Sequence, residues 1–190
     1  MVRLKMKALI VVDIQNDFCP GGALAISQGD KIIPFVNHLI EKTKDSGGLV
    51  VYTSDAHTPD HCSFKAQGGI WPVHCVAGTI GAALHKNLKI EGPLFLKATT
   101  QSVDSYSGFG GHNEQTKESL ESYLLKNNVT EVDVVGLALD YCVKSTALSS
   151  NEAGFKTCVE VKGTKSVNVN IGDDKKAIKE LIAAGVKVQE

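Results

Sequence analysis

Apolar runs alternate with amphipathic segments along this chain. Runs that lack polar alternation are typical of strands buried on both faces. The predicted strands are Ala8–Val12, Leu49–Thr53, Pro93–Lys97, Val132–Leu137 and Thr157–Val161, with a short last strand at Val186–Val188. Between them, apolar residues recur with helical spacing. The predicted helices run from Asp30, as the N-cap, to about Ser46, over Thr116–Asn127, from about Cys142 to Asn151, and over Asp173–Ala184.

Strands that each lead into a helix predict an α/β fold, a parallel sheet with helices on both faces. We expect one domain spanning residues 1–190, since no linker or repeat interrupts the pattern. Ligands of such sheets bind beyond the carboxyl ends of the strands. The residues just past strand ends are Asp13, Asp55, Lys97 and the segment Ala138–Cys142, so we expect them to share one crevice. The loop Ala56–Gly78 is too long for a simple connection and is a candidate for function.

Charge and composition narrow the class of protein. The 190 residues carry 20 Lys and Arg against 21 Asp and Glu, a formal net charge of −1. There is no basic stripe, which argues against binding of nucleic acid or of an acidic membrane surface. No apolar run approaches membrane-spanning length, and Ala8–Val12, interrupted by Asp13, is too short for a signal peptide core. The cysteines form no CxxC pair, so we expect reduced thiols and a cytoplasmic location; they are Cys19, Cys62, Cys75, Cys142 and Cys158.

The segment GLALDYCVKSTAL places Cys142 at the predicted start of a helix. Free amide groups and the dipole at a helix N-terminus favour a thiolate. Lys97, after LFL, can add positive charge, and Asp13 can accept the thiol proton. The three residues have the elements of an activated nucleophile. Each alone also fits a plain reading: a buried core thiol, a solvated lysine, or an aspartate that caps a turn or binds magnesium.

A second group of polar residues lies in DAHTPDH and WPVHC. Asp55 and His57 are two residues apart in extended chain, so their side chains point the same way, and His74 returns from the far side of the loop. One carboxylate and two imidazoles suit a zinc, iron or manganese ion with open positions. His61 is a further candidate ligand. The alternative is a set of surface histidines in a polar loop.

Three aromatic residues fall in loops near these strand ends and can wall a pocket for a flat ligand. They are Phe18, Trp71 and Tyr106. Ordinary loop packing explains any one of them equally well.

Five motifs, in order, resemble those of the nicotinamidases/pyrazinamidases of the isochorismatase-like cysteine hydrolase superfamily. They are DIQNDFCPGGAL, DAHTPDH with SF, WPVHCVAGTIGAALH, Lys97 with VDSYSGF, and GLALDYCVKSTAL. The resemblance runs from about Lys7 to Val188.

The resemblance implies a three-layer α/β/α sandwich with a six-stranded parallel sheet and a catalytic triad of Asp13, Lys97 and Cys142. It implies an oxyanion hole formed by the backbone N–H groups of Ala138 and Cys142, with a cis peptide bond between Leu137 and Ala138. Further implied roles concern the ligands. Asp55, His57 and His74 would bind one divalent metal ion, with Zn²⁺ preferred and Fe²⁺ or Mn²⁺ as alternatives. The substrate-binding residues would be Phe18, Trp71, Tyr106 and Ala138.

The implied activity is hydrolysis of nicotinamide to nicotinate and ammonia through a cysteine thioester, with pyrazinamide as a further substrate, in salvage for NAD synthesis. We expect a monomer or a small homo-oligomer. The alternatives are an amidohydrolase of ureido or carbamoyl amides and a non-catalytic metal-binding or redox-sensing module. The chain departs from the family pattern at Leu139, at Ala56 and in VKGTKSVNVN, where an arginine and a shorter turn are expected.

Overall fold

A computed structural model describes residues 6–190, so residues 1–5 of the expected domain lie outside the described residues. One seven-stranded sheet has the order β4-β3-β2-β1-β5-β6-β7. Six strands run parallel, as expected, and the short β4 is antiparallel to β3. The strands are β1 (Met6–Val12), β2 (Leu49–Asp55), β3 (Leu94–Lys97), β4 (His112–Asn113), β5 (Val129–Leu137), β6 (Lys156–Lys165) and β7 (Lys187–Gln189).

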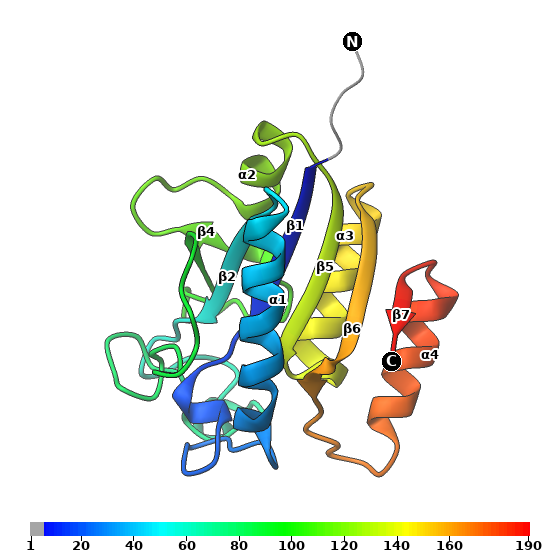
Figure 1. The fold of residues 1–190 in the computed structure, drawn as a ribbon. Coiled ribbons are helices and arrows are strands. Elements are labelled where there is room, and N and C mark those ends of the chain that lie inside the picture. The colour runs from blue at the N-terminus through cyan, green and yellow to red at the C-terminus, as the bar shows by residue number, and fades with distance from the viewer. Residues whose placement is uncertain (1–5) are drawn as a thin grey trace.

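Helices cover both faces of the sheet and complete the expected three layers (Figure 1). They are α1 (Ile33–Asp45), α2 (Leu120–Lys126), α3 (Lys144–Glu152) and α4 (Asp173–Ala183). Val36 and Ile40 of α1 pack in one buried cluster, whereas Leu124 of α2, Ala147 of α3 and Leu181 of α4 belong to the other. The sheet therefore has α1 on one face and the remaining three helices on the opposite face.

The central strand β1 explains why its sequence shows no polar alternation. Ile10 and Val12 face the cluster of α2, α3 and α4, whereas Leu9 and Val11 face α1. Successive side chains of a strand point to opposite faces, so a strand covered on both sides must be apolar at every position.

The predicted starts of three helices are wrong. α2 begins at Leu120, because Asn113 Oδ1 accepts the N–H of Thr116 in a preceding turn and Ser119 caps the helix. Asp30 does not cap α1; it lies in a 3₁₀ turn over Gly29–Ile32 that leads into the helix. Cys142 lies within a π-helical turn over Leu139–Val143, and α3 starts only after that turn.

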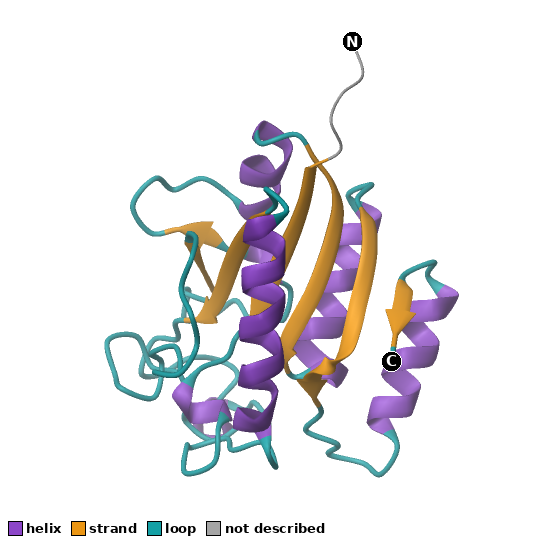
Figure 2. Cartoon of the chain, in the orientation of Figure 1, coloured by secondary structure: helices purple, strands orange, loops and turns teal. Residues whose placement is uncertain are grey.

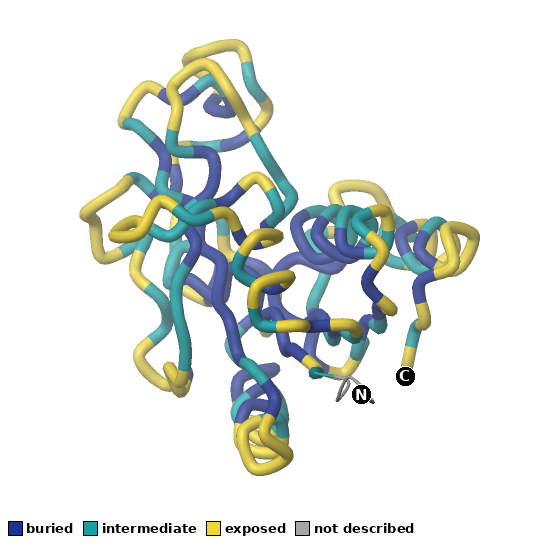
Figure 3. Tube along the Cα trace, turned by 90° about the horizontal axis from the view of Figure 1, so that it is seen from above, coloured by how far each residue is buried: buried dark blue, intermediate teal, exposed yellow. Residues whose placement is uncertain are grey.

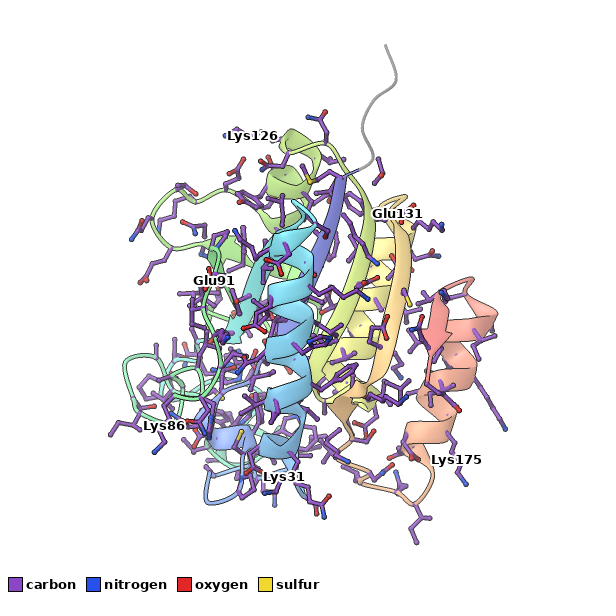
Figure 4. The ribbon with its side chains drawn as sticks, in the orientation of Figure 1. Lys31, Lys86, Glu91, Lys126, Glu131 and Lys175 are labelled. Atoms are coloured by element: carbon purple, nitrogen blue, oxygen red, sulfur yellow. The ribbon has the colours of Figure 1, made fainter. Side chains whose placement is uncertain are left out.

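The loops that leave the carboxyl ends of β1, β5 and β6 lie toward the bottom of Figure 2. Seen from above, buried backbone follows the strands and exposed backbone follows the outer loops (Figure 3). Labelled lysines such as Lys31, Lys126 and Lys175 are exposed at the periphery (Figure 4). Within residues 6–190, no helix combines the length and the apolar character needed to cross a bilayer.

Candidate active site

Lys97 lies at the centre of the polar residues that follow the strand ends. Its buried Nζ is 3.0 Å from Asp13 Oδ2, 2.5 Å from Asp55 Oδ1 and 3.4 Å from Cys142 Sγ. It also donates a hydrogen bond of 3.2 Å to the carbonyl oxygen of Ser105. The strand order explains the meeting, because β3, β2, β1 and β5 are consecutive neighbours in the sheet. The structure thus brings together the three predicted catalytic residues; their roles stay predictions.

Asp13 is fully buried immediately after β1, in a left-handed backbone conformation with φ of +47°. Thr53 donates a hydrogen bond of 2.7 Å to Asp13 Oδ1, which orients the carboxylate. Among the described residues, Asp13 Oδ2 has no well-aligned hydrogen-bond donor, although it forms the ion pair with Lys97. Burial raises the pKa of Asp13, opposed by the Lys97 ammonium. A raised pKa makes this carboxylate a stronger base.

Cys142 does not have the thiolate environment that its expected place at a helix N-terminus favours. Burial raises the pKa of Cys142 well above its ordinary value; Lys97 opposes the shift, and the carboxylates of Asp13 and Asp55 add to it. The sulfur is therefore a thiol in the resting chain and needs a proton acceptor before it can attack. Asp13 is the carboxylate placed to accept the proton, because one oxygen of Asp13, one oxygen of Asp55 and the sulfur of Cys142 lie within 4.8 Å of one another.

The backbone before Cys142 is shaped by two special positions. The peptide bond between Leu137 and Ala138 is cis, as the resemblance implies. Gly136 has φ of +116°, and a Cβ there would lie 2.0 Å from the carbonyl oxygen of Val12. Only glycine fits such a conformation and such a close approach. β5 can therefore end against β1 and deliver the segment Ala138–Cys142 to the crevice.

Asp55, His57 and His74 form a buried cluster whose ligand atoms all lie within 4.8 Å of one another. Nδ1 of His57 contacts the carbonyl oxygen of Ala98 at 3.2 Å, and Nδ1 of His74 contacts that of Pro72 at 2.8 Å. Such contacts fix the tautomer, because Nδ1 must donate, and leave Nε2 with a free lone pair. Burial lowers the pKa of His57 to about 4, which keeps the ring neutral. The donor set suits a divalent transition metal.

His61 does not join this cluster. Ser63 donates its backbone N–H to Nδ1 of His61 at 3.3 Å, and Nε2 faces the carbonyl oxygen of Val103 at 3.2 Å. Nε2 must therefore carry the proton, and neither nitrogen offers a free lone pair. The His61 ring instead stacks on His57, with centroids 4.2 Å apart.

Sequence reasoning overlooked Gln15, whose side chain holds the backbone of Asp55 in place. Its buried side chain donates to the carbonyl oxygen of Asp55 at 2.9 Å and accepts the N–H of Asp55 at 2.8 Å. It also donates to the carbonyl oxygen of Ala82 at 2.7 Å. A polar residue two positions after a predicted site aspartate was the available signal.

A pocket opens beside Cys142 and contains all four predicted substrate-binding residues in its lining. The tryptophan and tyrosine are joined, because Trp71 Nε1 donates to the Tyr106 hydroxyl at 3.0 Å. The complete lining is Phe18, Leu24, Ile26, Asp55, Trp71, His74, Tyr106, Ala138, Tyr141, Cys142 and Val167. Of these, sequence reasoning missed Leu24, Ile26 and Val167, and it placed Tyr141 in the crevice only as part of the segment Ala138–Cys142. The mixture of apolar walls and a few convergent polar groups is typical of a small-molecule site.

Known proteins are similar in sequence to this chain along nearly its whole length. The Isochorismatase domain family matches residues 7–190. The chain is 38% identical to a nicotinamidase of Escherichia coli, over 94% of this chain and 92% of the relative. It is also 38% identical to a nicotinamidase/pyrazinamidase of Mycobacterium tuberculosis, over 87% and 89% of the two chains.

Solved structures show the same fold. A pyrazinamidase of Pyrococcus horikoshii, in complex with zinc, superimposes with a TM-score of 0.88 at 40% identity, covering 97% of this chain and 99% of the other. PnC1 of L. infantum, in complex with nicotinate, superimposes with a TM-score of 0.84 at 33% identity, covering 98% of this chain and 93% of the other. With a family match over residues 7–190 and an α/β/α sheet that these structures share, the chain belongs to the isochorismatase family.

Proposed function

We propose that this chain is a nicotinamidase, which hydrolyses nicotinamide to nicotinate and ammonia and accepts pyrazinamide as well. The observation that carries the proposal is Lys97, whose ammonium group contacts both the acid Asp13 and the thiol of Cys142 at the edge of an aromatic-lined pocket. The names of the related enzymes supply the substrate.

The reaction begins with proton transfer from Cys142 to Asp13, while Lys97 stabilises the developing thiolate. The sulfur attacks the carboxamide carbon, and the backbone N–H groups of Ala138 and Cys142 hold the resulting oxyanion. A preorganised donor of this kind contributes about 10²- to 10³-fold in rate. The proton on Asp13 passes to the leaving nitrogen, so that the C–N bond breaks, ammonia departs and a thioester remains.

The thioester is cleaved by water in the second half of the cycle. Asp13, now a carboxylate again, takes a proton from the water as it attacks the acyl carbon. The C–S bond breaks, the sulfur regains a proton from Asp13, and nicotinic acid leaves and loses its own proton to solvent to become nicotinate. Each half-reaction uses the same carboxylate as base and then as acid, in keeping with its position between Thr53 and Lys97.

Asp55, His57 and His74 would hold one divalent cation, for which zinc is the first choice in view of the zinc-bound relative. A cation held there would supply Lewis acidity toward a heteroaromatic nitrogen and would leave generation of the nucleophile to Asp13 and Lys97. The chain's own contribution is a neutral His57, a His74 oriented by Pro72, and an Asp55 held by Gln15 and Lys97.

The experiment that tests this function measures ammonia release from nicotinamide, from pyrazinamide and from N-carbamoylsarcosine, with and without a chelator. We expect release from the two aromatic amides, and loss of that release after chelation. Turnover of the ureido compound without turnover of nicotinamide would overturn the proposal.

A further inference from the structure

The loop between β6 and α4, residues 166–172, starts beside the candidate active site. The last pairs of β6 with β5 are Gly136 with Thr164 and Leu137 with Lys165. Leu137 precedes the cis peptide bond to Ala138. The chain therefore enters this loop next to the segment that carries Cys142.

Asp140 anchors the near end of the loop. Its Oδ1 accepts the backbone N–H of Val167 at 3.0 Å, and its Oδ2 accepts that of Asn168 at 2.8 Å. The Asp140 side chain is buried, with 6% exposure of the residue. Both carboxylate oxygens are thus used to hold two successive amides, a charge-assisted arrangement that fixes geometry strongly.

The far end of the loop is tied to the start of α4. Asn168 Oδ1 accepts the N–H of Asp174 at 2.9 Å, and Asp173 Oδ2 accepts the N–H of Asn170 at 2.8 Å. Asn168 has φ of +52°, a conformation that asparagine tolerates better than most residues. The loop is therefore braced from the Cys142 segment on one side and from a helix on the other.

Held in this way, the loop places Val167 in the pocket wall and leaves Val169 exposed to solvent. Val167 lines the pocket together with Cys142 and Ala138, and it packs against the apolar cluster that contains Phe18. Val169 is 57% exposed and is not among the pocket residues. The two valines offer a matched pair in one loop.

We propose that Val167 is a specificity-determining residue, which limits the bulk that the pocket accepts on an aromatic amide ring, and that Asp140 is its positioning residue. The inference rests on the proposed function, since the ring is that of a pyridine carboxamide. Leu24 and Ile26 line the same pocket and are contributed by the loop after β1. The backbone of Val167, in contrast, is held by Asp140, which lies two residues before Cys142.

The test compares kcat/KM for nicotinamide with kcat/KM for its 2-, 4-, 5- and 6-methyl derivatives. Val167→Ala should raise the relative kcat/KM of at least one methyl derivative about tenfold, the lower end of what one methylene group commands in an apolar pocket. Val169→Ala, the matched control, should leave every ratio unchanged. Unchanged ratios in Val167→Ala, or the same change in Val169→Ala, would overturn the assignment.

Asp140 is tested by a double-mutant cycle on the same ratios. Asp140→Asn exchanges one acceptor oxygen for an amide that cannot accept an N–H, so it should raise KM for nicotinamide more than it lowers kcat. In the Asp140→Asn variant, the effect of Val167→Ala on selectivity should be smaller than in the wild type, because Asp140 holds Val167 in the pocket wall. Additive effects would show that Asp140 does not position Val167.

The two proposals fail in different ways. A folded wild-type protein that releases no ammonia from nicotinamide overturns the proposed function and this inference with it. If the wild-type protein is active on nicotinamide and Val167→Ala has the same selectivity ratios as the wild type, only the inference is overturned.

Discussion

The ammonium group of Lys97 lies 2.5 Å from Asp55, a residue of the candidate metal cluster, while it also contacts Asp13 and Cys142. One buried lysine therefore links the candidate metal site to the candidate nucleophile. Burial lowers the pKa of Lys97, but the carboxylates of Asp13 and Asp55 more than reverse this effect and hold it well above its ordinary value. Lys97 stays an ammonium throughout the neutral pH range.

Removal of the sulfur tests the covalent mechanism. Cys142→Ala should reduce kcat for nicotinamide by about 10⁴-fold or more, as loss of a nucleophile does in other hydrolases. Its metal content, measured by mass spectrometry, should equal that of the wild type. Cys158→Ala, a half-buried cysteine on β6, should retain full activity. A Cys142→Ala variant with near-normal turnover would exclude the thioester.

Removal of a histidine tests the metal site. His57→Ala should lose the bound divalent ion and should raise KM for nicotinamide, since two remaining ligands hold a metal poorly. His38→Ala changes an exposed histidine of α1 and should alter neither quantity. Normal metal content in His57→Ala would place the ion elsewhere.

The hydroxyl of Thr53 tests the orientation of Asp13. Thr53→Val keeps the shape but loses the 2.7 Å hydrogen bond to Asp13 Oδ1. We expect kcat to fall by about 10- to 100-fold, because misplaced catalytic groups lose much of their effect. KM and metal content should stay nearly constant. Thr53→Ser, which retains the hydroxyl, should restore most of the rate; if it is as slow as the valine variant, the hydrogen bond is not responsible.

The buried His57 predicts acid sensitivity of the metal-free protein. Its pKa of about 4 in the folded chain lies below the ordinary value, so the unfolded chain binds the proton first. The stability that this histidine contributes is complete above the ordinary pKa of about 6.5 and declines as pH falls towards 4, by at most about 1.4 kcal/mol per pH unit. Unfolding in urea at several pH values should show a shallower decline in His57→Gln than in wild type. Equal slopes would contradict the assignment.

Two glycines test the backbone at the end of β5. Gly136→Ala forces a Cβ against the carbonyl oxygen of Val12 and should unfold the protein or lower its melting temperature sharply. Gly154→Ala also has a positive φ but meets nothing within 4 Å, so it should cost only about 1 to 2 kcal/mol. Similar losses in the two variants would show that the contact with Val12 is unimportant.

The strands and the site positions could be predicted because buried parallel strands are apolar throughout and because their carboxyl ends share an edge. Asp13, Lys97 and Cys142 were placed together by that rule alone. The two-residue β4 carries no periodicity and was not predictable. The start of α2 was missed because Asn113 and Thr116 form a turn that competes with helix. The raised pKa of Cys142 depends first on burial and then on the carboxylates of Asp13 and Asp55, which no local pattern reveals.

Pocket walls from loops were the hardest to predict. Leu24, Ile26 and Val167 are single apolar residues in irregular segments, where no period marks the buried face. Asp140 looked like part of the cysteine motif, and its hydrogen bonds to Val167 and Asn168 span 27 and 28 positions in the sequence.

The enclosure of Lys97 between Asp13 and Asp55 also restricts how this sequence can drift over evolutionary time. Loss of Lys97 alone leaves the carboxylates of Asp13 and Asp55 buried next to each other without a counter-charge. Loss of either acid removes part of the attraction that offsets the cost of burying the Lys97 ammonium. A single substitution at any one of these three residues is therefore expected to destabilise the fold. We expect descendant sequences that lack Lys97 to carry a neutral residue in place of Asp13 or Asp55 as well.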